Sequence, residues 1–255
     1  MRFRITARPQ SRIARLPIHY NDLVQGYLYR IFEQSCPELH DHGYKYGNRA
    51  FRHFTFSRVI PKPFKRENDH LLVTDTLEYY ASFLMDPQLN AFVPHLIHDQ
   101  TMRLGNEEFE IVDVAAQSDP LPFNGQAQWE LKIQALSPIV AYRTEDREGK
   151  NYTHYFEPTD SEFASLIKDN AFRKYASLHS DMIPEEEDFS FSPIKVDLKR
   201  DFSLVKFKGY IIKGYMGTYR IRASSSLLGI LYHSGIGSKN PQGFGMFQVI
   251  DAKPL

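Results

Sequence analysis

Residues 233–250 read HSGIGSKNPQGFGMFQVI, and glycines stand at 235, 237, 243 and 245 in the pattern G-x-G-x-x-x-x-x-G-x-G. Glycine accepts positive φ and lets other atoms approach its backbone closely. The preceding ASSSLLGILYH (223–233) predicts a short amphipathic helix, and MFQVI (246–250) predicts a strand. Loops that hold nucleotide phosphates have the opposite order, strand and then helix. A mononucleotide site is therefore not expected here.

The composition is that of an ordinary soluble globular protein. The chain has 255 residues, of which 42% are hydrophobic and 24% charged, enough for one large domain or two small ones. Cys36 is the single cysteine, so no disulfide can form within the chain. The N-terminal MRFRITARP lacks the apolar core of a secretion signal, and no apolar run approaches a membrane span of ~18 residues. We expect a cytoplasmic protein with no membrane partner.

Charge is distributed unevenly along the chain. Residues 1–66 carry thirteen Lys or Arg against four acidic residues, and residues 194–255 carry ten against three, which gives +9 and +7. The middle, 67–193, carries eight against twenty-four, which gives −16. If the two ends meet in the fold, they form a basic surface suited to a polyanion. The alternative is scattered, solvated charge.

The first half predicts the element order β-α-β-β-α-β. RFRITA (2–7) alternates as a strand does, and YNDLVQGYLYRIFEQS (20–35) has a helical apolar stripe, with Asn21 as the N-cap. Strands are predicted at RHFTFSRVI (52–60) and HLLVTD (70–75), a helix at TLEYYASFLM (76–85), and a last β region at 109–117 and 128–138. This order is the ferredoxin-like arrangement.

The second half predicts the same order with less regularity. A strand at NYTHYF (151–156) precedes a helix at 160–178, strands near 191–198, 204–216 and 218–223, and then the short helix, glycine loop and final strand. The predicted fold class is α+β, with two tandem ferredoxin-like (βαββαβ, RRM-like) domains at 1–141 and 151–255. The polar YRTEDREGK (142–150) is the predicted linker.

Three segments carry a resemblance to a known family. They are GIGSKNPQGFGMFQV (235–249), LHDHGYKYGNRAFRHFTFSRV (39–59) and ALSPIVAYR (135–143). In this order they resemble the RAMP superfamily, and within it the endoribonucleases that cut CRISPR repeat transcripts into guide RNAs. The resemblance implies metal-independent cleavage that leaves a 2′,3′-cyclic phosphate and a 5′-hydroxyl. A non-catalytic RNA-binding subunit of a CRISPR effector complex is the alternative. An unrelated RNA-binding module would need an RRM stacking motif, which the sequence lacks.

In that family the glycine-rich loop lies against RNA between the two domains. The resemblance therefore predicts RNA contacts from the loop, with uncovered glycine amides donating to phosphate oxygens and a lysine adding charge. The alternative is a tight helix-to-strand connection whose glycines only satisfy backbone geometry. The predicted RNA-binding residues are Gly235, Gly237, Lys239, Asn240, Gly243 and Gly245.

Metal-independent RNA cleavage needs proton transfer at the 2′-hydroxyl and the 5′-oxygen, and cations that stabilise the charged transition state. The family resemblance places the catalytic histidine at His40, with His42 as its competitor. Tyr29, calculated to lie on the polar face of its helix, matches a tyrosine of the family's site. Arg52 occupies the position of the family's lysine. Arginine keeps the charge but cannot donate a proton near neutral pH.

Other candidates carry less weight. Lys45 or Arg49 could replace Arg52, and the group His95, His98 and Asp99 has a metal-like composition without a metal-like setting. No metal and no cofactor is expected. The expected partners are CRISPR repeat RNA and, for the alternative function, a CRISPR effector complex, with the protein acting as a monomer or homodimer.

Overall fold

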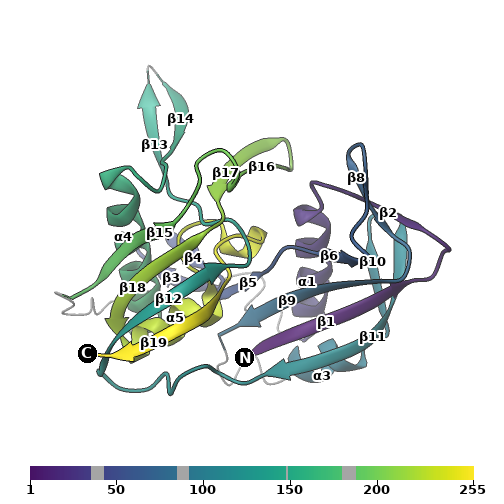
Figure 1. Ribbon diagram of the computed structural model, residues 1–255, viewed down its shortest axis with the longest axis horizontal. Coiled ribbons are helices and arrows are strands. Elements are labelled where there is room, and N and C mark those ends of the chain that lie inside the picture. Colours follow the sequence, from purple (N-terminus) through teal and green to yellow (C-terminus); the bar gives the residue numbers. More distant parts are fainter. Residues whose placement is uncertain (36–42, 85–91, 148, 180–187) are drawn as a thin grey trace.

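The computed structural model describes residues 1–35, 43–84, 92–147, 149–179 and 188–255. Two antiparallel sheets lie side by side along the long axis of the molecule, each packed against helices (Figure 1). The predicted α+β class with two ferredoxin-like units is confirmed. Of the helices in the described ranges, none is long and apolar enough to cross a membrane.

The first sheet has β1 at its centre. Its strands run in the order β10-β11-β1-β9-β5, and β6 also pairs with β9. The strands are β1 (Arg2–Pro9), β5 (Phe54–Phe56), β6 (Ile60–Lys62), β9 (Thr76–Phe83), β10 (Thr101–Leu104) and β11 (Glu107–Gln117). Helices α1 (Asn21–Ser35) and α3 (Phe92–His98) complete the unit. Because β1 pairs with both β9 and β11, the arrangement is the split βαβ of a ferredoxin-like fold.

One predicted element of this unit is wrong. The segment predicted as a helix at 76–85 forms β9, between β1 and β5. Leu77, Tyr79, Ala81 and Phe83 are buried at every second position, which is the period of a strand. The second helix of the unit is α3. Pairing with two neighbouring strands overrides the helical propensity of the segment.

Two smaller β structures extend the first unit. One is a three-stranded sheet of β2 (Ala14–Pro17), β7 (Arg66–Glu67) and β8 (His70–Val73). The other is the hairpin of β3 (Tyr44–Tyr46) and β4 (Arg49–Phe51), which packs on a helix of the second unit.

The second sheet has the strand order β15-β18-β12-β19. Its strands are β12 (Gln128–Ala135), β15 (Ser190–Lys195), β18 (Thr218–Ser224) and β19 (Phe247–Pro254), and its helices are α4 (Ser161–Leu178) and α5 (Ser225–Ser234). The Ser224 hydroxyl accepts from the Leu227 N–H and caps α5. These helices and the closing strand are where the sequence places them.

The predicted place of β12 and of the linker is wrong. Residues 128–135 were assigned to the first unit, but β12 pairs with β18 and β19 in the second sheet. The chain therefore passes from the first sheet to the second between Gln117 and Gln128. The predicted linker contributes to a hairpin of β13 (Tyr142–Arg147) and β14 (Lys150–Tyr155). A local pattern identifies a strand, whereas its sheet depends on long-range pairing.

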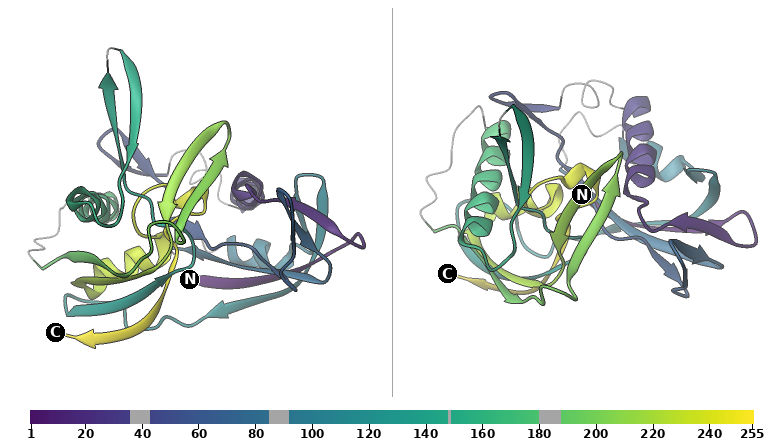
Figure 2. Two further views of the ribbon diagram at one scale, coloured as in Figure 1. Left: turned by 45° about the horizontal axis from the view of Figure 1, so that its top comes forward. Right: turned by 90° about the horizontal axis from the view of Figure 1, so that it is seen from above.

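Two hairpins project from the same side of the molecule. They are β13–β14 and the hairpin of β16 (Phe202–Phe207) and β17 (Tyr210–Tyr215) (Figure 2). Each unit has its own buried core, and a third cluster joins the turn end of the β16–β17 hairpin and the residue before β13 to the glycine-rich loop. The members of this third cluster are Val140, Phe207, Ile212 and Phe244.

Candidate functional site

The glycine-rich loop lies at the junction of the two units. Three side chains of the first unit donate to its carbonyl oxygens. The Asn21 amide donates to Gln242 at 2.8 Å, the Gln25 amide to Pro241 at 2.9 Å, and the Thr55 hydroxyl to Phe244 at 2.9 Å. Asn21, predicted as a helix N-cap, is the first residue of α1 and binds the loop instead.

The loop packs too tightly for side chains at all four of its glycines, and most tightly at Gly243 and Gly245. Gly243 and Gly245 have φ of 84° and 75°, which other residues rarely adopt. A Cβ at Gly245 would lie 1.9 Å from the Ile236 carbonyl oxygen, and one at Gly243 would lie 2.3 Å from the Phe56 ring. These glycines are therefore needed for close packing inside the junction.

The expectation that glycine amides are uncovered is wrong for three positions. The N–H of Gly235 donates to Leu231 at 2.8 Å, that of Gly243 to Asn240 at 2.9 Å, and that of Gly245 to Pro138 at 2.9 Å. A backbone amide that is buried in the junction needs a hydrogen-bond acceptor within the chain, and each of these three has one. The alternative interpretation, a connection whose glycines satisfy backbone geometry, describes these three positions.

Lys239 and Asn240 have different surroundings although they are neighbours. Lys239 is the N-cap of the short 3₁₀ helix η2 (Asn240–Gln242), and Asn240 is its first residue. Asn240 is 4% exposed, and its amide donates to the Ile236 and Phe244 carbonyl oxygens. Lys239 is half-buried at φ 64°, with its Nζ 4.9 Å from the centre of the Tyr142 ring. The side of the loop that carries Lys239 therefore presents a cation outside the junction.

A buried lysine that the sequence analysis missed holds the inner side of the loop. Lys174 of α4 is 3% exposed, and its Nζ donates to the Gly235 oxygen at 2.6 Å, the Gly237 oxygen at 3.3 Å and the Asn240 Oδ1 at 2.6 Å. Burial lowers the pKa of Lys174 to about 7. The feature of the sequence that marks Lys174 as buried is its helical spacing from Ile167 and Ala171, because it continues their buried stripe on α4.

His53 lies beside this lysine at the same junction. Its Nε2 is 3.0 Å from the Ser177 hydroxyl of α4, and its ring lies 4.9 Å from the Tyr44 ring between centres. Burial, together with the nearby Lys174 cation, lowers the pKa of His53 to about 3. The segment from β3 to β5 is thereby packed against α4.

Of the predicted catalytic residues, His40 lies outside the described residues, as does its competitor His42. Tyr29 and Arg52 are described and lie together, with the Arg52 Cζ 5.8 Å from the centre of the Tyr29 ring. Gly43, three positions after His40 in the sequence, packs beside Arg52. A Cβ built on Gly43 would lie 3.4 Å from the Arg52 Cγ.

The predicted polar setting of Tyr29 is wrong in part. Its ring packs at the edge of the first core, 5.7 Å from the Phe54 ring and 6.4 Å from the Phe32 ring between centres. Burial raises the pKa of Tyr29, although the Arg52 charge opposes this effect. A neutral phenol beside a guanidinium can donate a hydrogen bond to an anionic or hydroxyl group.

The less favoured candidates are dispersed. Lys45 and Arg49 are exposed on the β3–β4 hairpin. Asp99 pairs with Arg30 at 2.9 Å rather than completing a group with His95 and His98. Within the described ranges, no group of three or more His, Cys, Asp or Glu residues could hold a metal ion.

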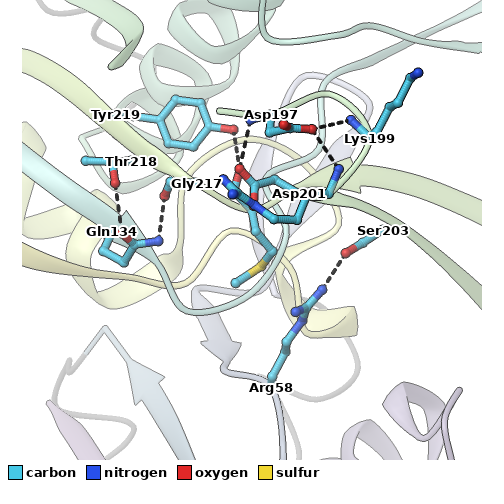
Figure 3. A network of polar contacts seen from close by, with 11 residues as sticks. Arg58, Gln134, Asp197, Lys199, Asp201, Ser203, Gly217, Thr218 and Tyr219 are labelled. Carbon is cyan, nitrogen blue, oxygen red and sulfur yellow. Dashed lines mark hydrogen bonds and ion pairs between the residues drawn. The ribbon is translucent and has the colours of Figure 1, made fainter. Parts of the chain in front are cut away.

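The two basic ends of the chain do meet. A cleft with a volume of about 340 Å³ lies between the units, lined by His19, Arg58 and Arg66 from one end and by β16 from the other. Arg58 donates to the Ser203 hydroxyl of β16, and Asp197 accepts from the N–H groups of the turn just before that strand (Figure 3). The base of the β16–β17 hairpin is thus fixed against the first unit.

Family models match both halves of the chain. The model for CRISPR-associated protein Cas6, N-terminal, matches residues 15–115, and the one for CRISPR associated protein Cas6, C-terminal, matches residues 122–249. The chain belongs to the Cas6 family. This Cas6 chain is 28% identical to the CRISPR-associated endoribonuclease Cas6 of Pyrococcus furiosus, over 98% of this chain and 90% of the relative.

Other Cas6 proteins are similar in sequence or in fold. The chain is 26% identical to CRISPR-associated endoribonuclease Cas6 1 of Methanocaldococcus jannaschii, over 80% of this chain and 76% of the relative. A structure of a Cas6-related protein from Pyrococcus furiosus has a TM-score of 0.81 at 20% identity, covering 98% of both chains. A Cas6 product complex has a TM-score of 0.64 at 18% identity and covers both chains fully.

Proposed function

We propose that this protein is an endoribonuclease that cuts CRISPR repeat transcripts into guide RNAs. The observation that carries the proposal is the contact between Tyr29 and Arg52 beside Gly43, which is three positions after His40 in the sequence, in a chain of the Cas6 family. The two curated relatives described above are both endoribonucleases.

The proposed reaction is attack of a ribose 2′-oxygen on the adjacent phosphorus. The 2′-hydroxyl gives up its proton, the 2′-oxygen bonds to phosphorus, and the bond from phosphorus to the 5′-oxygen breaks. The departing oxygen takes a proton, which leaves a 2′,3′-cyclic phosphate and a 5′-hydroxyl. His40 transfers protons, because the pKa of histidine is suited to both directions near neutral pH.

Tyr29 and Arg52 supply orientation and charge. A phenol at the edge of the core is held in one orientation by the Phe54 and Phe32 rings, so it can position a ribose or phosphate oxygen. The Arg52 guanidinium stabilises the extra negative charge that develops on the phosphate in the transition state. Each step needs only these side chains, and no metal-bound intermediate is proposed.

The nucleophile can be tested on the RNA itself. The substrate is the repeat RNA of the array that neighbours the gene, with one 2′-deoxy substitution at the nucleotide before the scissile phosphate. We expect this RNA to be bound but not cut, and the unmodified RNA to be cut in excess EDTA. Normal cutting of the substituted RNA, or loss of cutting in EDTA, would show that the proposed chemistry is wrong.

The histidine can be tested with a matched pair of variants. We expect His40→Ala to slow single-turnover cleavage by roughly 10²–10⁴ with RNA affinity within a few-fold, the usual effect of removing a proton-transfer group. His42→Ala is the control and should cut at close to the wild-type rate. The opposite pattern would assign the role to His42, and normal cutting by both variants would contradict catalysis by either histidine.

The second candidate is a non-catalytic RNA-binding subunit of a CRISPR effector complex. Arg52 favours it, because arginine at this place cannot supply the proton that the family's lysine can. Full affinity for repeat RNA without any cleavage, by the wild-type protein, would select this candidate. The cytoplasmic location and the monomeric or homodimeric state remain predictions.

A further inference from the structure

A second polar and aromatic pocket lies away from Tyr29 and Arg52, between the two projecting hairpins. It has a volume of about 600 Å³, within the range of small-molecule sites, which is roughly 300–1,000 Å³. Tyr142 and Tyr155 of β13–β14 line one side, and Phe207 and Tyr210 of β16–β17 line the other. Gln242 of the glycine-rich loop also lines the pocket.

The two sides are held at a fixed separation. The Tyr155 hydroxyl donates to the Ile211 carbonyl oxygen at 3.0 Å and so connects one hairpin to the other. The buried cluster of Val140, Phe207, Ile212 and Phe244 packs the turn end of the β16–β17 hairpin and the residue before β13 against the loop. A pocket that exists before binding loses little conformational entropy when a ligand enters.

Lysines surround this aromatic pocket. Lys208, Lys213 and Lys239 are among its lining residues, and none of the described lining residues is acidic. The Lys239 Nζ lies 4.9 Å from the centre of the Tyr142 ring, and the Lys208 Nζ lies 5.5 Å from that of Phe207. Tyr210, at 76% exposure, leaves a large aromatic face uncovered beside these cations.

This chemistry matches one nucleotide of a single strand. Every nucleobase has a face that can stack on an aromatic ring, and the attached phosphate needs a cation within reach. A duplex does not fit, because its bases are already stacked and paired, whereas an unpaired base can be turned out into a pocket. An apolar peptide segment would leave the three lysine charges without partners.

We propose that the pocket between the β13–β14 and β16–β17 hairpins binds an unpaired nucleotide of the RNA substrate. The base stacks on the tyrosine side chains, and its phosphate contacts Lys208, Lys213 or Lys239. This inference rests on the proposed function, which makes RNA the substrate, and adds a recognition site that is separate from Tyr29 and Arg52.

The test uses the same repeat RNA, with 2-aminopurine in place of the base at each unpaired position in turn. Stacking on tyrosine quenches 2-aminopurine fluorescence, so one position should be quenched by the wild-type protein and not by Tyr210→Ala. We expect Tyr210→Ala to bind unmodified RNA roughly 5- to 150-fold more weakly, the usual effect of losing one stacked base. Tyr152→Ala is the matched control, a half-exposed tyrosine of β14 outside the pocket lining.

An abasic nucleotide at the quenched position identifies the ligand of the pocket. It should weaken binding to the wild-type protein by about the same factor as Tyr210→Ala, and cause little further loss in that variant. Suppose that Tyr210→Ala and Tyr152→Ala bind RNA equally and no position is quenched, although the wild-type protein still cuts. The proposed pocket would then be wrong, and the proposed cleavage would stand. Quenching that depends on Tyr210 in a wild-type protein that never cuts would support the pocket and contradict the proposed cleavage.

Discussion

Two lysines lie on opposite sides of the glycine-rich loop, and one is buried whereas the other is half-exposed. Lys174 is buried beneath the loop, and its ammonium group donates to two carbonyl oxygens and to the Asn240 side chain. Lys239 belongs to the loop itself, is half-exposed, and lies over the Tyr142 ring at the edge of the hairpin pocket. The ammonium group on the inner side is therefore hydrogen-bonded within the protein, whereas the ammonium group on the outer side is partly exposed to solvent.

This difference separates two roles of the loop, packing between the units and binding RNA, which the glycine pattern alone suggests together. On the inner side, glycines permit backbone approaches that no side chain allows, and the amides of Gly235, Gly243 and Gly245 bond within the chain. A change there should act on stability and on the junction of the units. A change on the outer side should act on RNA and leave folding intact.

The largest expected effect is at Gly245. Gly245→Ala should lower the free energy of unfolding by at least about 3 kcal/mol, because positive φ and a severe contact with the Ile236 oxygen add together. Gly209→Ala is the control, since Gly209 has φ 85° but no atom within 4 Å of an added Cβ. Gly209→Ala should cost about 1–2 kcal/mol, the cost of the left-handed backbone alone. Urea unfolding that shows equal losses would contradict the tight packing inferred for the loop.

The next effect concerns the buried ammonium group of Lys174. Its pKa is 10.5 in the unfolded chain and about 7 in the fold. Between these values the unfolded chain binds a proton that the fold does not, so stability rises with pH. From pH 7 to 9 this group should add about 2–3 kcal/mol to the free energy of unfolding, and Lys174→Met should remove that rise.

Lys168→Met is the control for this slope, because it removes a partly exposed lysine from the same helix. The variant should keep the wild-type rise of stability between pH 7 and 9. Measurement of unfolding by urea at four pH values in this range gives the slopes. A wild-type slope that survives Lys174→Met would contradict the assignment.

A smaller effect of the same kind is expected from His53 on the acidic side. Its pKa is 6.5 when unfolded and about 3 in the fold, so the unfolded chain takes up the proton first as the pH falls. Stability should be lost from pH 6.5 downward, by about 2 kcal/mol at pH 5. The His53→Phe variant should lose less stability over this interval. It should still lose some, because His233, whose pKa is also about 3, titrates in both proteins. Identical acid unfolding curves would contradict this role of His53.

Local patterns in the sequence predict some elements of the fold and not others. Helices α4 and α5 and the final strand have clear periods and were predicted close to their observed bounds. In β9, frequent helix formers concealed the alternation of Leu77, Tyr79, Ala81 and Phe83, and the pairing that decides its structure comes from β1 and β5. Strand β12 was recognised as a strand, but its partners lie about ninety positions or more away in the chain, by the register of Leu131 with Ile221.

The candidate site was predicted unevenly for a similar reason. Short motifs identify Arg52, Tyr29 and the loop, and the first two do lie together. The environment of each residue was harder to predict. The packing of Tyr29 against Phe54 and the burial of Asn240 depend on segments that are distant in sequence. Lys174 has no motif, and only its place in a buried helical stripe marks it.

The smallest expected effect, at Lys239, is the one that completes the comparison. Lys239→Ala should change the free energy of unfolding by less than about 0.5 kcal/mol, because its side chain is outside the packed junction. If Lys239 contacts one phosphate, affinity for single-stranded RNA should fall a few-fold, and the slope of log affinity against log salt should become shallower by about 0.7. Lys168→Ala is the control for RNA binding and should leave that slope unchanged. Should Lys239→Ala instead destabilise the fold as strongly as a change at Gly245, with an unchanged salt slope, the outer side of the loop would be structural like the inner side, and the separation of the two roles would be wrong.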